Sequence, residues 1–229
     1  LPDGTHMLVL RPPLVPEGMA LVFDRPARSA LTAEDLVAAG RMDGATLRLI
    51  RDGLNARRNL MVCGGQHAGK TAFLNGILHL VPAEDRVLVV EGRRELALNR
   101  KNVIRLSGDG LAGCGEGVCI LPRLYPDLVV VPDVEGTGAD TLVRLALAGQ
   151  SGLVSSMVAH SAESCFSRFE LLVSLANPSL APEVVHQAVR QALDIVVVLG
   201  ADEDGTFRVV SAAEMDPDRG MLKFLEPGG

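Results

Sequence analysis

A glycine-rich segment directly after the apolar run 60–63 restricts the possible folds of this chain more than any other feature. Its residues are Gly64, Gly65, Gln66, His67, Ala68, Gly69, Lys70 and Thr71. They match the phosphate-binding pattern G-x-x-x-x-G-K-[ST], which requires a strand before it and a helix after it. Both are expected, because residues 60–63 form a short apolar run and residues 72–80 have a helical pattern. An ordinary glycine-rich turn is the alternative, and this context favours a P-loop.

The spacing within this segment has a physical cause. Glycine permits a backbone that turns several amide N–H groups toward one point, and the following helix begins beneath the bound phosphates. Lys70 is positioned to reach the β and γ phosphates, and the hydroxyl of Thr71 to bind magnesium. The predicted ligands are therefore ATP and Mg²⁺. His67, an imidazole at the apex of the loop, either contacts the nucleotide or points to solvent.

The remaining apolar runs predict an α/β fold. Short apolar strands are expected at 59–63, 87–90, 128–131, 153–157 and 195–199, separated by helical stretches. This alternation is typical of a mainly parallel sheet with helices on both faces. The unbroken apolar run 128–131 is typical of a strand buried on both sides. Asp204 and Gly205 lie between two such runs and predict a C-terminal antiparallel hairpin.

The N-terminal part of the chain has a different pattern. Residues 1–30 contain five prolines and the short apolar runs 8–10 and 21–23, which we expect to form edge strands. Thr32 followed by Asp35 is a helix-capping signal, and Gly40 is expected to end that helix. A second helix is expected over residues 45–57. We therefore expect residues 1–30 to form a lead-in segment and residues 31–229 the main domain.

Composition narrows the function classes. Hydrophobic residues make up 48% of the 229 residues and charged residues 22%, as in a globular enzyme, and no apolar run is long enough to span a membrane. The formal net charge of -6 argues against a nucleic-acid partner. The four cysteines are irregularly spaced, without a CxxC pair, which together with the absence of a signal peptide predicts a reduced, cytoplasmic chain.

A P-loop needs acidic partners, which are expected at the ends of neighbouring parallel strands. Asp133 follows the run 128–131 and is the candidate magnesium-binding or water-orienting carboxylate. Glu91 follows the run 87–90 and is the candidate auxiliary acid. Glu95 and Glu135 lie close by in sequence and are more typical of solvated surface carboxylates. His160, after the run 153–157, is a candidate γ-phosphate sensor, with a purely structural role as the alternative.

At this point the chain resembles a known family, the secretion ATPases of type II and type IV secretion and of type IV and tight-adherence pili. The likeness is greatest to the tight-adherence (CpaF-like) branch. The matching segments are residues 1–4, 12–13, 31–37, 59–75, 91–96, 125–128 and 167–170. The resemblance implies a RecA-like C-terminal motor domain, with residues 1–30 as the end of an N-terminal domain.

The resemblance also implies partners. Members of this family form hexamers at the cytoplasmic face of the inner membrane and use ATP hydrolysis to drive pilus assembly or secretion. The expected partners are therefore further copies of the chain, or a paralogue in a mixed ring, and an inner-membrane platform protein. The expected location is cytoplasmic and peripheral to the inner membrane.

Several positions depart from the family pattern. The family carries glycine at His67, aspartate at Gly92 and histidine at Val158, so that only a shifted alignment recruits His160. It has Gly-Glu-Ile-Arg-Gly where this chain has residues 132–136, which places Asp133 and Glu135 at the glutamate and the arginine. The segment 107–123 is short, and Arg123 retains one of the family's two arginines there and is a candidate sensor.

Missing positive charge near the γ-phosphate slows hydrolysis. An active motor ATPase and a nucleotide-binding or ring-stabilising relative without activity therefore both stay open. A small-molecule kinase is a third alternative, but the chain lacks an arginine-rich lid segment.

Overall fold

The computed structural model describes residues 5–24, 31–92, 95–107, 121–202, 205–216 and 221–225. Contacts between residues divide the chain into two units, Leu1–Ala30 and Leu31–Gly229. In the first unit, strands β1 (His6–Leu10) and β2 (Ala20–Asp24) pair antiparallel. This confirms that the two short apolar runs of the N-terminal segment are strands.

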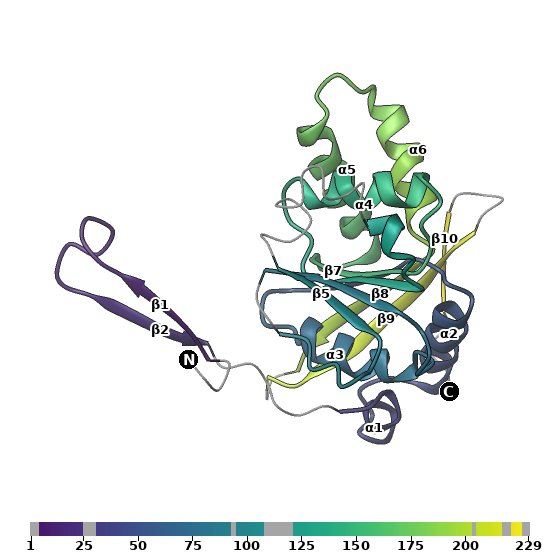
Figure 1. Ribbon diagram of the computed structural model, residues 1–229, viewed down its shortest axis with the longest axis horizontal. Coiled ribbons are helices and arrows are strands. Elements are labelled where there is room, and N and C mark those ends of the chain that lie inside the picture. The colour runs from purple at the N-terminus through teal and green to yellow at the C-terminus, as the bar shows by residue number, and fades with distance from the viewer. Residues whose placement is uncertain are drawn as a thin grey trace. The chain divides into compact units, whose positions relative to one another are not determined.

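The second unit is built on one large sheet (Figure 1). Within the described residues it has eight strands in the order β10-β9-β8-β3-β7-β6-β4-β5. Strands β3 to β8 run parallel to their neighbours within that group, while β9 and β10 are antiparallel. The strands are β3 (Leu60–Gly64), β4 (Val87–Glu91), β5 (Val103–Ser107), β6 (Leu128–Val131), β7 (Leu153–Val158), β8 (Ile195–Ala201), β9 (Phe207–Asp216) and β10 (Met221–Phe224).

Helices cover both faces of this sheet, with α4, α5 and α6 on one side and α1, α2 and α3 on the other (Figure 1). The helices are α1 (Ala33–Ala38), α2 (Gly44–Asn55), α3 (Lys70–Ile77), α4 (Gly138–Leu147), α5 (Ala162–Ala176) and α6 (Pro182–Ala192), with short 3-10 helices η1 (Leu78–Leu80) and η3 (Leu121–Leu124). The predicted α/β fold, with a mainly parallel sheet and helices on both faces, is confirmed.

Strand β3 explains why there are two cores. Side chains of a strand point alternately to the two faces of a sheet. Leu60 and Val62 accordingly pack with α1, α2 and α3, while Met61 and Cys63 pack with α4, α5 and α6. All of them are fully buried, so an unbroken apolar run is what this position in the sheet requires.

The helix starts follow the capping chemistry expected from the sequence. The hydroxyl of Thr32 accepts from the amide of Asp35 at 3.1 Å, and the carboxylate of Asp35 accepts from the amide of Thr32 at 2.9 Å. This capping box begins α1, as predicted. Helix α2 starts one residue earlier than expected, after its N-cap Asp43. It ends two residues earlier than expected, because Arg57 adopts a left-handed φ of 57° and cannot continue the helix.

The edges of the sheet differ from the sequence prediction. The expected hairpin forms between β8 and β9, with Gly205 in its turn and Asp204 outside the described residues. The sheet continues one strand further to β10, which the sequence analysis missed together with β5 at the opposite edge. Both strands are only four or five residues long, and Arg105 interrupts the apolar pattern of β5.

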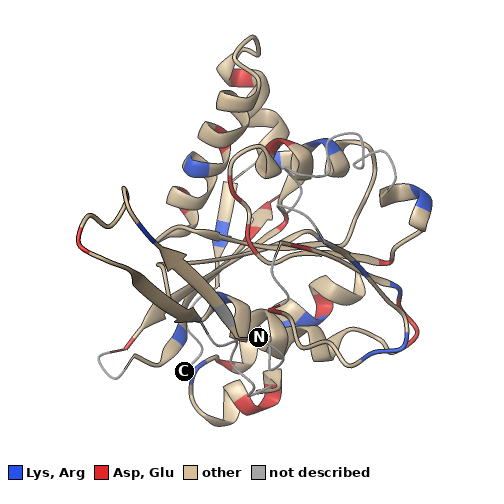
Figure 2. Cartoon of the chain, turned by 60° about the vertical axis from the view of Figure 1, so that its left-hand side comes forward, with Lys and Arg blue, Asp and Glu red and all other residues tan. Residues whose placement is uncertain are grey.

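The charged residues and the cysteines together form no single cluster within the described residues. Acidic and basic residues lie interspersed over the helices and loops in the view of Figure 2. Cys63 and Cys165 are buried free thiols, whereas Cys114 and Cys119 lie outside the described residues. Of the helices described, none combines the length and the apolar character needed to cross a bilayer.

Asn59 ties three elements together at the amino edge of the sheet, and its removal is expected to destabilise the fold. Its side chain donates to the carbonyl of Ala192 at 3.1 Å and accepts from the amide of Leu153 at 3.0 Å. Since Asn59 is 7% exposed, Asn59→Ala leaves both partners without water, and we expect a loss of about 2–4 kcal/mol in the free energy of unfolding. Chemical denaturation measures this, with the exposed Asn55→Ala as the matched control; equal midpoints for the two variants would contradict it.

Candidate nucleotide-binding site

The predicted P-loop joins β3 to α3 in the middle of the sheet. Strand β3 lies between β7 and β8, while β4, the next strand along the chain, lies on the far side of β7 and β6. The chain therefore leaves β3 toward β4 on one side of the sheet and later, after β7, crosses to β8 on the other side of β3. In open α/β sheets such a switch point, outside the carboxyl ends of the strands, is where ligands bind.

The backbone of the loop requires glycine at its end. Gly69 is the N-cap of α3 with a left-handed φ of 74°, and a Cβ atom there would lie 2.3 Å from Cδ1 of Phe207. His67 is also left-handed, with a φ of 62°. Left-handed residues alternating with others form a concave row of amide groups, which suits an anion. The helix dipole of α3 adds partial positive charge at the same place.

Side chains of the loop differ in exposure. Gln66 and His67 are exposed at its apex, while Ala68 is buried and its amide donates to the carbonyl of Gly65 at 3.3 Å. The imidazole of His67 is thus exposed to solvent. A role of His67 toward a nucleotide stays a prediction.

Lys70 lies against the inner side of the loop. Its ammonium donates to the carbonyl of Gly65 at 2.8 Å and, more weakly, to that of Gly64 at 3.4 Å. Partial burial lowers the pKa of Lys70, while the charges of Asp133 and Cys63 act in the opposite direction. A cation held in this desolvated position gains free energy from any anion placed on the loop.

Thr71 lies on the side of the site nearest the segment that follows β4. Its hydroxyl donates to a carboxylate oxygen of Glu95 at 3.2 Å. The sequence analysis regarded Glu95 as a solvated carboxylate, but the fold places it against the residue expected to bind magnesium. Thr71 and Glu95 therefore form one polar pair, and the signal for it in the sequence was the position of Glu95 four residues after Glu91.

Glu91, the expected auxiliary acid, is fully engaged with its own chain. One carboxylate oxygen accepts from the amides of Glu95 and Leu96 at 3.1 and 3.2 Å, and the other pairs with Arg105. Arg105 also donates to the carbonyl of Leu96 at 2.9 Å. The Glu91 side chain is 6% exposed, so this carboxylate holds the segment that carries Glu95. Arg105 was missed because only the fold brings β5 beside β4.

Asp133 lies at the same carboxyl edge, after β6. The residues on either side of it are anchored, because the hydroxyl of Ser156 donates to the carbonyl of Pro132 and the amide of Val134 donates to the carbonyl of Ser156 at 2.8 Å. Val134 is buried, whereas Asp133 is exposed at the end of the strand. The fold therefore places the Asp133 carboxylate at the edge of the sheet where Lys70 begins α3.

Four charged side chains act on Asp133. Partial desolvation raises its pKa most, and the carboxylates of Glu135 and Glu95 raise it further. Lys70 and Arg168, the latter on α5, act in the opposite direction. Asp133, Glu95 and Lys70 thus lie within electrostatic reach of one another, and acidic charge outweighs basic charge around Asp133.

His160 lies beside the loop. A Cβ atom on Gly65 would be 3.4 Å from Cε1 of His160, and the amide of Ala159 donates to the carbonyl of Gly64 at 3.3 Å. Val158, where the family has its histidine, pairs with Gly64 in the sheet. His160 therefore reaches the loop from two residues further along the chain, as the shifted alignment requires.

Arg123 is not brought to this place. It belongs to η3, where the carbonyl of Leu124 accepts from Arg86 at 2.8 Å. Arg86 precedes β4 and so lies at the amino edge of the sheet, opposite the P-loop. Residues 108–120, which form most of the shortened segment before Arg123, lie outside the described residues.

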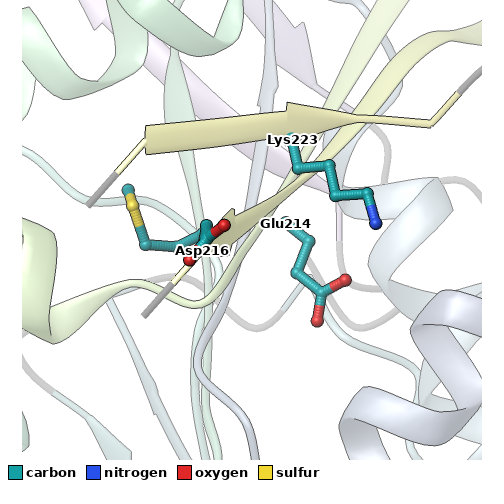
Figure 3. Close-up of a pocket in the computed structure, with 4 residues that line it drawn as sticks. Glu214, Asp216 and Lys223 are labelled. Carbon is teal, nitrogen blue, oxygen red and sulfur yellow. The ribbon is translucent and has the colours of Figure 1, made fainter. Parts of the chain in front are cut away.

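A depression lined by Glu214, Met215, Asp216 and Lys223 is separate from this site (Figure 3). Glu214 pairs with Ile195 at the start of β8 and forms an ion pair with Arg58, which precedes β3. The depression therefore lies at the amino edge of the parallel strands and shares no residue with the P-loop.

Comparison with known proteins identifies a family and several relatives. The family model described as "Type II/IV secretion system protein" matches residues 9–200. The conjugal transfer protein TrbB of Rhizobium radiobacter is 30% identical over 193 residues, which cover 82% of this chain and 59% of that protein. This chain therefore spans about three fifths of the length of that relative.

Two solved structures are similar in fold. The VirB11 ATPase of the Brucella suis type IV secretion system, in complex with sulphate, superposes with a TM-score of 0.70 at 21% identity over 95% of this chain and 75% of that one. The pilus retraction motor PilT with bound ADP gives 0.63 at 15% identity over 100% of this chain and 65% of that one. These similarities confirm the predicted RecA-like fold. Placement in the tight-adherence branch stays a prediction.

The ion pair beneath Glu95 is expected to matter for stability. Arg105→Met leaves the buried carboxylate of Glu91 without its cation, and we expect the free energy of unfolding to fall by about 3 kcal/mol. The double variant Glu91→Gln/Arg105→Met removes the unpaired charge and should regain more than half of that loss. Denaturation in urea measures both, and a single variant as stable as the wild type would show that the pair has no such role.

Glu135 is expected to control the protonation of Asp133. Because its charge raises the pKa of Asp133, Glu135→Gln should lower that pKa, whereas the distant Glu84→Gln should leave it unchanged. The pKa of folded Asp133 lies above its unfolded value, so its contribution to stability is present below the unfolded pKa and is lost as pH rises through the folded pKa. Carbon-13 NMR titration of the Asp133 carboxyl group measures the shift; identical curves in the wild type and Glu135→Gln would refute the assignment.

Proposed function

The chain belongs to the type II/IV secretion system protein family, and we propose that it binds ATP with Mg²⁺ and hydrolyses it as a subunit of a secretion or pilus-assembly motor. The observation that carries this proposal is the loop itself. A half-buried lysine, a left-handed glycine N-cap and the start of α3 meet at the switch point of a parallel sheet. That combination of groups suits the terminal phosphates of a nucleoside triphosphate.

The P-loop residues would divide the binding of the triphosphate among them. The backbone amides of residues 65–71 donate to phosphate oxygens, and the ammonium of Lys70 exchanges the carbonyl of Gly65 for the β and γ phosphates. Thr71 and Asp133 are the residues that would hold Mg²⁺. This ion, when bound, neutralises charge that develops on the phosphates during hydrolysis.

Two carboxylates can orient the attacking water. Asp133 stands at the end of β6, and Glu95 reaches the same edge through its contact with Thr71. We assign the orienting role to this pair, and to Glu91 the positioning of Glu95 through the backbone amides that it holds. His160, packed against Gly65, is suited to sense the terminal phosphate.

The relatives and the family resemblance support a proposal on assembly and location. TrbB is a conjugal transfer protein, VirB11 an ATPase of a type IV secretion system, and PilT a pilus retraction motor. We therefore propose that this chain works in a hexameric ring, of identical copies or mixed with a paralogue. Its place would be the cytoplasmic face of the inner membrane, against a membrane platform protein.

A second candidate is a subunit that binds ATP without hydrolysing it. The observation that favours it is the acidic surrounding of Asp133, where Glu135 replaces the family's arginine and raises the pKa of Asp133. A protonated or repelled carboxylate orients water poorly, and positive charge near the γ-phosphate is reduced. This candidate shares the P-loop with the first and differs only in turnover.

Lys70→Ala tests the proposal, with the exposed Lys101→Ala at the amino edge as the matched control. Loss of a charge-assisted contact should weaken ATP affinity roughly 10- to 100-fold, and phosphate release should fall to background, while the control behaves as the wild type. Calorimetry measures binding, and a steady-state phosphate assay measures turnover. Binding without phosphate release in the wild type selects the second candidate, and absence of ATP binding in the wild type refutes both.

A further inference from the structure

We propose that Arg41 and Phe207 form the surface that receives the base and ribose of the nucleotide. The inference rests on the proposed function, because it concerns the half of ATP that the P-loop does not hold. The P-loop and Lys70 take the β and γ phosphates, so the adenosine half must be held by groups beside the loop. Phe207, at the start of β9, lies against Gly69 at the end of the loop, and Arg41, in the connection between α1 and α2, lies over the ring of Phe207.

Phe207 is fixed in place by its neighbours. Its ring lies on Gly69, where a Cβ atom would be 2.3 Å from the ring carbon Cδ1. It also meets Phe73 of α3 edge to face, with ring centroids 6.4 Å apart and planes at 88°. The side chain is 8% exposed. Phe207 therefore forms a rigid apolar support directly beside the residue that starts α3.

Arg41 lies on this support. Its Cζ atom is 5.4 Å from the centroid of the Phe207 ring, within the range of a cation–π contact. Its carbonyl accepts from the amide of Val209 at 2.7 Å, which ties the connection between α1 and α2 to β9. The backbone beneath the guanidinium is thus held by the same strand that carries Phe207.

The guanidinium of Arg41 has N–H donors that no described residue uses. Within the described part of the chain it forms no ion pair and no hydrogen bond, although Arg41 is partly buried. Two other arginines of this unit with intermediate exposure, Arg57 and Arg105, are paired with Asp85 and Glu91. A planar cation that is stacked on one face and unpaired at its edge can stack on a purine and donate to ribose oxygens.

A charge contact of Arg41 with the phosphates and a stacking contact with the base predict different effects of Arg41→Lys, and the test is designed to separate them. A contact with the phosphates would depend on the positive charge alone, and Arg41→Lys would preserve it. A contact with the base depends on the planar guanidinium, so lysine cannot replace it. Inorganic tripolyphosphate, which carries the phosphates without adenosine, separates the two cases directly.

The experiment measures dissociation constants for ATP and for tripolyphosphate, each with Mg²⁺, by calorimetry. We expect Arg41→Ala and Arg41→Lys to weaken ATP binding roughly 5- to 30-fold and to change tripolyphosphate binding less than about twofold. Phe207→Leu, which keeps an apolar side chain in the core, should weaken ATP binding in the same sense. The exposed Arg48→Ala is the matched control and should bind both ligands as the wild type does.

Each other outcome overturns a defined statement. Unchanged ATP affinity in Arg41→Ala, with thermal unfolding as in the wild type, refutes the surface. Equal weakening of ATP and tripolyphosphate refutes it as well, since Arg41 would then act on the phosphates. If Lys70→Ala weakens both ligands while Arg41→Ala weakens neither, the inference fails and the proposed function stands. A wild-type chain that binds neither ligand refutes the proposed function and this inference together.

Discussion

The half-buried ammonium of Lys70 under a row of backbone amides is the interaction on which the rest of this structure depends. Burial lowers the pKa of Lys70, and within the chain the ammonium finds the carbonyls of Gly65 and Gly64. The amides and the dipole of α3 add positive potential at the same place. This concentration of positive potential at one turn suits an anion. The parallel strands, the glycines and the packing of Phe207 all serve to hold that turn.

The acidic residues around the loop divide into two groups with different tasks. Glu91 is buried, paired with Arg105 and bonded to two amides, so it acts on the chain. Asp133 and Glu95 lie at the carboxyl edge of the sheet, and the charge of Glu95 raises the pKa of Asp133. Glu95 accepts from the hydroxyl of Thr71, while Asp133 lies within electrostatic reach of Lys70 and Glu95. Whether bound ATP is hydrolysed depends, in this account, on the charged groups around Asp133.

Local patterns in the sequence predicted much of this arrangement. The apolar runs identified β3, β4, β6, β7 and β8, and the G-x-x-x-x-G-K-[ST] pattern identified the loop, because both depend on neighbouring residues. Strand β5 pairs with residues of β4 that lie 16 positions earlier, and the contacts of Arg105 with Glu91 and of Glu95 with Thr71 join residues 14 and 24 positions apart. Arg41 and Phe207 are separated by most of the chain. Such contacts follow from the sheet order, which no local pattern contains.

The central claim is that the turn after β3 encloses the terminal phosphates of a nucleotide. A crystal structure with a nonhydrolysable ATP analogue and Mg²⁺ tests it most directly. The account predicts the β phosphate within hydrogen-bond distance of the amides of residues 65–71, with the ammonium of Lys70 moved from the carbonyl of Gly65 to the phosphates. Density for the analogue elsewhere, such as the depression beside Glu214 and Lys223, with Lys70 still bound to Gly65, would contradict it.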